Sequence, residues 1–367
     1  MADAPGEIDA VLLWVDGCDP AFRASLAPHI DRSNFGAAVN RFRSNGELRY
    51  ALRSIERFAP WVRHVHLVTN GQVPGWLDRS TVRLVSHREI FPDPSVLPVF
   101  NSCAIELCLH RIEGLSRHFL YMNDDMFFGR PTPREYFFAD NGAPKVLFQE
   151  THLHDRAGEG ALHNRSFGYT QNIIAQETGR RMPRFIFAHA PVVLDRLKIK
   201  ELVARYAGEV RKTLAHRFRH PEDLSIRVVY NSHVTEERYD GSVAHEVLRR
   251  GSDYDFLMLG SGLRRDIRQL RSLRRIMPRL FCINDDLGDG MAAAVSLFAL
   301  RKTLQSILPD RSGFEMTSEA GPAGIRAGVQ PGKKPSSRMS PIENGQSSGK
   351  VSKSRPVSFS ASTRASR

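Results

Sequence analysis

Cysteine is scarce in this 367-residue chain, and the four that occur do not form a recognisable metal motif. Cys18, Cys103, Cys108 and Cys282 show no zinc-finger spacing, and their positions do not indicate a disulfide framework. We therefore expect a reducing compartment rather than a disulfide-stapled secreted domain. The hydrophobic and charged fractions, 41% and 25%, are those of an ordinary globular protein.

Targeting and membrane-spanning segments are also missing from the sequence. Residues 1–7 contain neither a basic nor an apolar signal-peptide region, so no secretory signal is expected. The best apolar run, residues 291–300, is too short to cross a bilayer. The Gly-x-Gly-x-x-Gly and Walker signatures of nucleotide binding are absent as well. These absences favour a cytoplasmic protein without a standard nucleotide motif.

The formal charge of +12 is unevenly distributed. From Met316 onward the chain has nine Lys and Arg against two Glu, and it is rich in Ser, Gly and Pro, so residues 316–367 are expected to be a disordered tail. A second basic cluster has helical spacing and could face nucleic acid, anionic lipid or an anionic sugar polymer, although a solvated helix face is favoured. Its members are Arg264, Arg265, Arg268, Arg271, Arg274, Arg275 and Arg279.

Short apolar runs separated by helical patterns predict one buried sheet. The strands are expected at residues 8–15, 65–69, 82–86 and 119–123, with helices at 47–61 and 102–115. This order predicts an α/β protein with a Rossmann-like sheet flanked by helices. A helix after Gly290 is expected to end the ordered part near residue 315.

An apolar strand followed by Asn-Asp-Asp occurs twice. The two copies are Asn123-Asp124-Asp125 and Asn284-Asp285-Asp286. Adjacent carboxylates beside buried strands are costly to desolvate unless a cation or hydrogen-bond donors satisfy them. Ligands bind beyond the carboxyl ends of strands in open α/β sheets, and magnesium prefers oxygen ligands. One copy could be a surface turn, but two copies favour acids from separate segments around one cation.

Further polar residues stand where the sequence predicts strand ends. Asp16, Asn70 and Gly71 follow two of the apolar runs in turn-forming contexts. Asp9 is an acid inside the first run, and it is either a satisfied polar residue near the strand's start or a buried site acid.

Other candidate site residues are basic. Arg49 and Arg53 belong to a stripe that is either solvated, paired with acids or phosphate-binding. His189 lies between apolar residues before a proline, as a core histidine or a general base. Arg219 and His220 begin a charged segment that caps a helix or clamps a phosphate.

Together these motifs resemble the Stealth family, which includes bacterial capsular-polysaccharide phosphotransferases and the catalytic chain of eukaryotic N-acetylglucosamine-1-phosphotransferase. The matching segments are Ile8-Asp9-Ala10-Val11 with Trp14-Val15-Asp16-Gly17-Cys18-Asp19, Glu47-Leu48-Arg49-Tyr50 through Tyr121-Met122-Asn123-Asp124-Asp125, Ala188-His189-Ala190-Pro191 with Arg219-His220-Pro221-Glu222-Asp223, and Cys282-Ile283-Asn284-Asp285-Asp286. The resemblance implies a catalytic domain at 1–315, built from blocks 8–19, 41–150, 187–235 and 280–315. The large insertions of the eukaryotic branch are missing, and the tail lies outside the family pattern.

The resemblance implies transfer of hexose-1-phosphate from a UDP-N-acetylhexosamine-type donor to a hydroxyl of an oligo- or polysaccharide acceptor, with release of UMP. It also implies a GT-A-like, nucleotide-sugar-binding sheet, Mg²⁺ or Mn²⁺ as cofactor, no specific nucleic-acid partner, and a location that could include the inner face of the plasma membrane.

Roles for individual residues follow from this resemblance. His189 is the expected base, Asp125 and Arg219 act with it, and Arg49 or Arg53 is a second choice of phosphate clamp. The expected metal ligands are Asp124, Asp125, Asp285 and Asp286, and the expected substrate contacts are Asp9, Asp16, Asn70, Gly71, Asn123, His220 and Asn284. Two rival functions remain, a metal-dependent glycosyltransferase, which would release UDP, and a non-enzymatic polyanion-binding protein.

Overall fold

Parallel strands form the central sheet, because near-continuous apolar runs are buried on both faces. The order is β3-β2-β1-β4-β8, with β8 antiparallel to β4 and the other neighbours parallel. The strands are β1 (Ile8–Leu13), β2 (Val62–Thr69), β3 (Arg83–Ser86), β4 (His118–Asn123) and β8 (Val192–Asp195). This computed structural model describes residues 6–30, 39–140, 142–152, 162–179, 185–236, 245–288 and 290–317. The predicted α/β class is confirmed.

Two smaller sheets accompany the central one. β10 (Tyr254–Leu259) is parallel to β11 (Leu280–Asp285), which is antiparallel to β5 (Met126–Phe128). β6 pairs with β7 and β9, and the three span Val146–His152, Phe185–Phe187 and His245–Leu248. Since β5 follows β4 after a two-residue turn, the Asn-Asp-Asp segment at 123–125 lies where the chain passes between two sheets.

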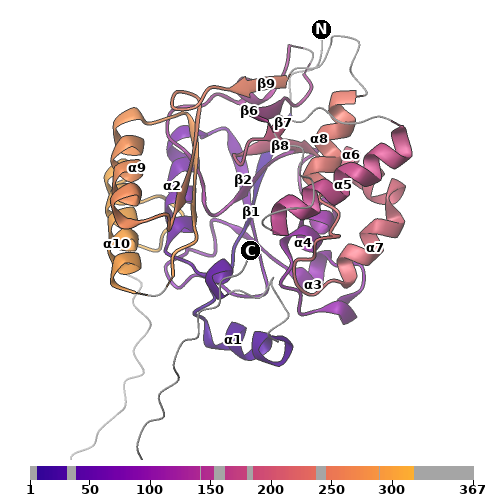
Figure 1. Cartoon of the computed structure of the whole chain (residues 1–367), viewed down its shortest axis with the longest axis horizontal. Coiled ribbons are helices and arrows are strands. Elements are labelled where there is room, and N and C mark those ends of the chain that lie inside the picture. Colours follow the sequence, from indigo (N-terminus) through magenta and orange to yellow (C-terminus); the bar gives the residue numbers. More distant parts are fainter. Residues whose placement is uncertain are drawn as a thin grey trace, which may run out of the picture. The chain divides into compact units, whose positions relative to one another are not determined.

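Helices cover the sheets on two sides (Figure 1). α2 (Glu47–Phe58), α9 (Leu263–Ile276) and α10 (Met291–Ile307) lie on one side, and α2 contacts β5. The helices in the other part are α3 (His87–Ile90), α4 (Ser102–Cys108), α5 (Leu162–Thr178), α6 (Arg196–Arg205), α7 (Ala207–Ala215) and α8 (Ile226–Glu236), and α1 (Pro20–Leu26) follows β1. No helix in the described ranges is long and apolar enough to cross a bilayer.

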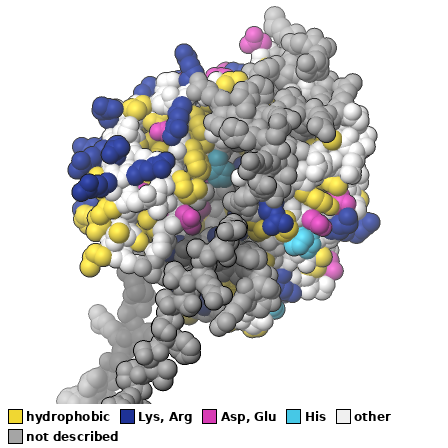
Figure 2. Space-filling view, in the orientation of Figure 1, with side chains coloured by type: hydrophobic (Ala, Val, Ile, Leu, Met, Phe, Trp, Pro, Cys, Tyr) yellow, Lys and Arg dark blue, Asp and Glu magenta, His cyan; other side chains and the backbone are white. Residues whose placement is uncertain are grey.

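The basic segment after residue 263 forms α9, as its spacing predicted. Six of its arginines are exposed, and dark-blue side chains gather on this side of the molecule in Figure 2. The predicted tail lies outside the described residues from 318 onward.

The arginine stripe on α2 binds another part of the chain. Arg53 is 6% exposed and donates to both carboxylate oxygens of Glu315, at 2.6 and 3.0 Å. It also donates to the carbonyl of Leu308 at 2.8 Å. Arg49 lies 3.6 Å from the same carboxylate and over the ring of Trp76. The stripe therefore fixes the segment that follows α10 against α2.

Replacing Arg53 by Met is expected to destabilise the fold by about 3–5 kcal/mol, because it leaves the buried Glu315 carboxylate without its main partner. Arg57→Met is the matched control, since Arg57 is half exposed and lies 3.8 Å from an exposed Asp310. Urea unfolding should show less than about 1 kcal/mol for this control. Equal midpoints for the two variants would contradict the assigned role of Arg53.

Candidate functional site

The carboxyl ends of β1, β2 and β4 meet at one edge of the central sheet. In the strand registers, Leu13 pairs with both Val68 and Asn123. The loops that follow these strands therefore lie side by side, and they contain Asp16, Asn70, Gly71, Asp124 and Asp125. The residues that the sequence placed after separate apolar runs thus lie at one edge of the sheet.

Gln72 joins two of these loops. Its Oε1 accepts from the backbone N–H of Asp16 at 3.0 Å, and its Nε2 donates to the Asp16 carbonyl at 2.8 Å. Gly71 has φ +106°, a left-handed conformation that favours glycine, and Asn70 before it is exposed. The Asp16 carboxylate accepts from the N–H of Cys18 at 2.8 Å. Asn70 and Gly71 thus present an open backbone turn at the edge.

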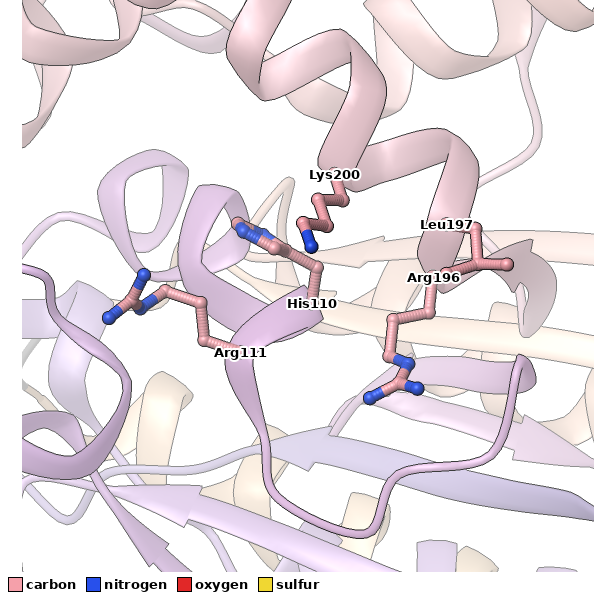
Figure 3. Close-up of a pocket in the computed structure, with 5 residues that line it drawn as sticks. All are labelled: His110, Arg111, Arg196, Leu197 and Lys200. Atoms are coloured by element: carbon pink, nitrogen blue, oxygen red, sulfur yellow. The ribbon is translucent and has the colours of Figure 1, made fainter.

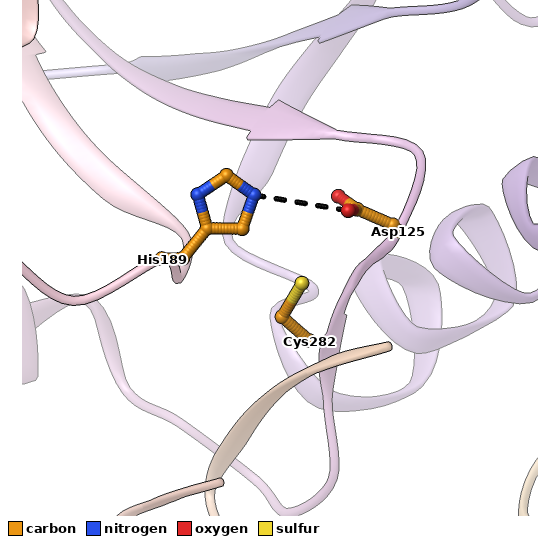
Figure 4. Close-up of side chains that lie close together, drawn as sticks. All are labelled: Asp125, His189 and Cys282. Carbon is orange, nitrogen blue, oxygen red and sulfur yellow. Dashed lines mark ion pairs between the residues drawn. The ribbon is translucent and has the colours of Figure 1, made fainter. Parts of the chain in front are cut away.

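Asp125, His189 and Cys282 come together from three separate segments (Figure 4). His189 Nε2 lies 3.7 Å from Asp125 Oδ2, and one potential ligand atom from each residue lies within 4.8 Å of the others. Burial and then the Asp125 carboxylate raise the pKa of the Cys282 thiol well above its usual value, so it is a neutral thiol here. The sequence placed Asp125 and His189 in the site but missed Cys282, which stands inside an apolar strand.

Strand β10 holds the His189 loop in place. The backbone N–H of His189 donates to the Tyr254 hydroxyl at 3.2 Å, and that hydroxyl lies 3.3 Å from the His189 carbonyl. The Phe256 ring meets the imidazole edge-to-face, with centroids 6.0 Å apart. Because Tyr254 is 2% exposed, these contacts fix the imidazole beside Asp125.

The acids at this edge fit a divalent cation. Among the described residues, Asp125 Oδ1 is buried and has no hydrogen-bond partner. Burial, then the carboxylates of Asp125 and Glu47, raise the pKa of Asp124 well above its usual value. An unpartnered buried carboxylate oxygen and crowded acids are what a bound Mg²⁺ or Mn²⁺ would satisfy.

Replacing Asp124 by Asn is expected to stabilise the protein in EDTA at neutral pH, while removing a proposed metal ligand. The pKa of Asp124 is higher in the folded than in the unfolded protein. Asp124 therefore lowers the stability of the folded state once the pH rises above the pKa of Asp in the unfolded chain, about 4. The Tm should rise by ~1–3 °C, because about 1 kcal/mol shifts the Tm of a large domain by less than that of a small one. The gain should vanish in acid, where both states are protonated; a gain that persists there would contradict the electrostatic explanation.

The second Asn-Asp-Asp segment ends β11 and is partly neutralised. Asp285 Oδ2 accepts from Asn45 Nδ2 at 2.7 Å, and Oδ1 lies 3.4 Å from Arg43 Nη1. Asn45 also donates its backbone N–H and its side chain to the buried Glu47, at 2.6 and 2.7 Å. Both oxygens of Asp285 are thus engaged within the protein, which makes it a poorer metal ligand than Asp124 or Asp125. Asn284 Oδ1 accepts from the N–H of Asp285 at 3.0 Å, within its own segment.

Arg219 and His220 stand in the loop between α7 and α8. The fully buried Asp223 orders this loop, since its carboxylate accepts from the N–H of His220 at 2.7 Å and from Asn101 Nδ2 at 2.9 Å. Arg219 Nε donates to the Ser102 hydroxyl at the start of α4, at 3.1 Å. The loop therefore holds an arginine in a fixed position.

A second arginine lies near the first. Burial and then the charge of Arg219 lower the pKa of Arg41, whereas the Asp286 carboxylate acts in the opposite direction. Arg219 and Asp286 are therefore each within electrostatic range of Arg41. Two arginines with a single exposed carboxylate leave excess positive charge, which suits a phosphate group.

The structure corrects the expectation for Asp9. Its side chain is fully buried at the opposite, amino end of β1, where Arg63 donates to both carboxylate oxygens at 2.9 Å and the N–H of Ser116 donates at 2.8 Å. Burial raises the pKa of Asp9, but His66, which lies 3.5 Å from Oδ2, together with Arg63 and Ser116 outweighs burial and holds this pKa far below its usual value. Of the two alternatives for Asp9, the structure therefore supports a polar residue with satisfied hydrogen bonds and not a buried site acid. Arg53 is also corrected, since Glu315 occupies its buried guanidinium group, whereas Arg49, which is 37% exposed, stays a predicted substrate contact.

Buried polar residues behind the site were missed in the sequence. The Tyr121 hydroxyl lies 2.9 Å from Glu106 Oε1 and 2.8 Å from Asn123 Oδ1. Arg227 lies 3.5 Å from the other Glu106 oxygen and over the Tyr121 ring. This network orients Asn123, and no sequence pattern marks residues so far apart as partners.

A separate basic cavity of about 330 Å³ lies away from this edge (Figure 3). Arg196 and Leu197 begin α6 after β8, whose end pairs with the amino end of β4. Burial and then Arg111, Lys200 and Arg196 lower the pKa of His110. The cavity is therefore positively charged but shares no side chain with the site around Asp125.

Matches to family regions and to individual proteins point to the same family. Residues 41–146 match conserved region 2 of Stealth proteins, and residues 188–236 match conserved region 3. An exopolysaccharide phosphotransferase of Streptomyces coelicolor is 38% identical over 327 residues, covering 85% of this chain and 53% of that protein. An exopolysaccharide phosphotransferase of Nocardia farcinica is 33% identical over 328 residues, covering 86% of this chain and 62% of that protein. The exopolysaccharide phosphotransferase CpsY of Mycobacterium tuberculosis is 33% identical over 292 residues, covering 71% of this chain and 53% of that protein. The chain thus spans little more than half the length of these curated relatives.

Solved structures show a more distant likeness. The galactosyltransferase LgtC, in complex with donor and acceptor sugar analogues, has 11% identity and a TM-score of 0.41, covering 85% of this chain and 98% of its own. Mouse xyloside xylosyltransferase 1 has 11% identity and a TM-score of 0.32, covering 75% and 97%. Likeness at this level concerns the fold alone and carries no argument about the reaction.

Proposed function

Because this chain belongs to the Stealth family, we propose that it transfers a hexose-1-phosphate from a UDP-sugar to a hydroxyl group of a saccharide acceptor. A phosphodiester forms and UMP leaves. The names of the similar proteins, exopolysaccharide phosphotransferases, support this reaction class and an acceptor of the oligo- or polysaccharide kind. The observation that carries the proposal is the Asp125–His189 pair at the carboxyl edge, with one buried and unpartnered carboxylate oxygen.

The proposed step uses His189 as a general base. A sugar hydroxyl is a weak nucleophile, so a positioned base is needed, and His189 takes the proton as the acceptor oxygen attacks the β-phosphorus. The bond between the acceptor oxygen and the β-phosphorus forms, and the bond from that phosphorus to the bridging oxygen of UMP breaks. The Asp125 carboxylate, 3.7 Å from Nε2, stabilises the imidazolium that results.

Charge on the transferred phosphate is offset by this chain's own cations. Arg219, fixed by Ser102 and the buried Asp223 loop, is the proposed clamp, and Arg41 adds a second positive charge nearby. When bound, Mg²⁺ or Mn²⁺ would neutralise further phosphate charge, and Asp124 and Asp125 are the residues that would hold it. Asp286 stays a predicted ligand.

The donor would lie along the adjoining loops. Asp16, Asn70 and Gly71 stand on the same edge as Asp125, and Asn123 is oriented toward the loop by Tyr121. We assign these four to donor contacts. His220, in the loop between α7 and α8, and Asn284, in β11, stay predicted substrate contacts.

The released nucleotide tests this function. The protein would be incubated with UDP-N-acetylglucosamine, magnesium and a short oligosaccharide, and the products read by mass. The proposal expects UMP together with an acceptor that has gained a hexosamine phosphate. Release of UDP with an acceptor that has gained only the sugar would instead establish glycosyl transfer.

A further inference from the structure

Helix α10 exposes an apolar stripe to solvent. Met291, Val295 and Phe298 are 82%, 39% and 62% exposed, and their spacing of four and three residues puts them on one helix face. Lys302 continues the same face one turn later, with its ammonium 5.6 Å from the centre of the Phe298 ring. Large apolar side chains aligned on an exposed helix face usually mark an interaction site.

The neighbouring helix α9 is lined with positive charge. Its exposed arginines are Arg264, Arg265, Arg268, Arg271, Arg274 and Arg275. None of them forms an ion pair with a carboxylate in the part of the chain that the structure describes. The one acid on this helix, Asp266, is buried and accepts from Ser296 of α10 at 2.7 Å. The basic face is therefore uncompensated.

The two helices run side by side in the same direction. They follow the parallel strands β10 and β11, and the Asp266–Ser296 hydrogen bond joins the first turn of α9 to the second turn of α10. Figure 2 shows Lys and Arg side chains gathered where Figure 1 places these helices, with hydrophobic side chains below them. We call the apolar stripe of α10 together with the six arginines of α9 the α9–α10 surface.

We propose that the α9–α10 surface docks the protein on an anionic lipid bilayer. Arginines attract the charged headgroups, while Met291 and Phe298 enter the boundary between headgroups and acyl chains. A second copy of the chain is a poorer occupant, because a symmetric contact would place six arginines against six arginines. Nucleic acid would satisfy the charge but not the apolar stripe.

Vesicle co-sedimentation of the full chain tests this proposal. Wild type should bind vesicles of phosphatidylcholine with phosphatidylglycerol, and binding to phosphatidylcholine alone should be far weaker. A triple variant should lose binding by roughly fivefold per arginine removed. Its changes are Arg264→Gln, Arg268→Gln and Arg271→Gln. The matched control has the same change in net charge from exposed arginines elsewhere, at Arg79→Gln, Arg88→Gln and Arg211→Gln, and should bind like wild type. Both variants keep the basic residues after Met316.

A second pair of variants tests the apolar stripe. Phe298→Ser should weaken binding most at high salt, where the electrostatic part is screened. Leu197→Ser is its control, since Leu197 is 51% exposed on α6. Equal vesicle binding by the two triple variants would overturn the proposal. So would capture of a soluble acidic polysaccharide, polygalacturonate, without any binding to vesicles.

Discussion

Replacing Asp125 by Asn is expected to lower kcat/KM for sugar-phosphate transfer roughly a thousandfold or more. This corresponds to an increase of several kcal/mol in the activation free energy. Asn keeps the shape of the side chain but removes its charge. The buried oxygen without a partner would then neither attract a cation nor stabilise a protonated His189. Both proposed contributions of Asp125 are lost at once, which is why this effect should be among the largest.

The folded state should tolerate the Asp125→Asn change. The carboxylate lies beside that of Asp124, so removing its charge relieves repulsion between the two acids. Thermal unfolding in EDTA should show no loss of stability. Asp310→Asn is the control for charge removal, because Asp310 is 84% exposed and far along the chain after α10. An Asp125→Asn variant with wild-type turnover would remove this residue from the proposed mechanism.

Replacing His189 by Gln is the second large change, with an expected loss of about 10²–10⁴ in kcat. The amide can hydrogen-bond but cannot take a proton near neutral pH. KM for the donor should change much less than kcat, because the donor contacts are assigned to Asp16, Asn70, Gly71 and Asn123. Added imidazole should restore part of the activity, since it supplies the missing base.

The pH profile separates a base from a structural histidine. Loss of a general base should change the pH dependence of kcat between wild type and His189→Gln, whereas loss of a packing contact should lower kcat by the same factor at every pH. His64→Gln is a suitable control because His64 is partly exposed beside Asp9, at the other end of the sheet. A His189→Gln variant whose kcat keeps the wild-type pH dependence, or that imidazole does not rescue, would contradict the assignment of the base.

Strand ends were predictable from the sequence because apolar runs and turn residues are local signals. The repeat of Asn-Asp-Asp placed Asp124 and Asp125 at a sheet edge before any coordinates. The same reasoning failed for Asp9, since burial of an acid in a strand does not tell which end of the sheet it occupies. Its partners Arg63 and Ser116 lie 54 and 107 residues away along the chain.

Contacts between residues far apart in the chain also explain the other differences between the sequence predictions and the structure. The arginine stripe of α2 had three possible partners in the sequence, and only the packing of the segment after α10 selects Glu315 for Arg53. Cys282 belongs to an apolar run, and nothing local marks it as a site residue. Its proximity to Asp125 depends on how β11 pairs with β5, which is not a local property.

The fate of the donor's β-phosphate distinguishes sugar-phosphate transfer from sugar transfer. UDP-N-acetylglucosamine labelled at its β-phosphorus would be incubated with the full chain, magnesium and an oligosaccharide acceptor. Attack at that phosphorus predicts that the label moves to the acceptor and that the released UMP is unlabelled. Label found in free UDP, with an unlabelled glycosylated acceptor, would show attack at the sugar carbon and contradict the account.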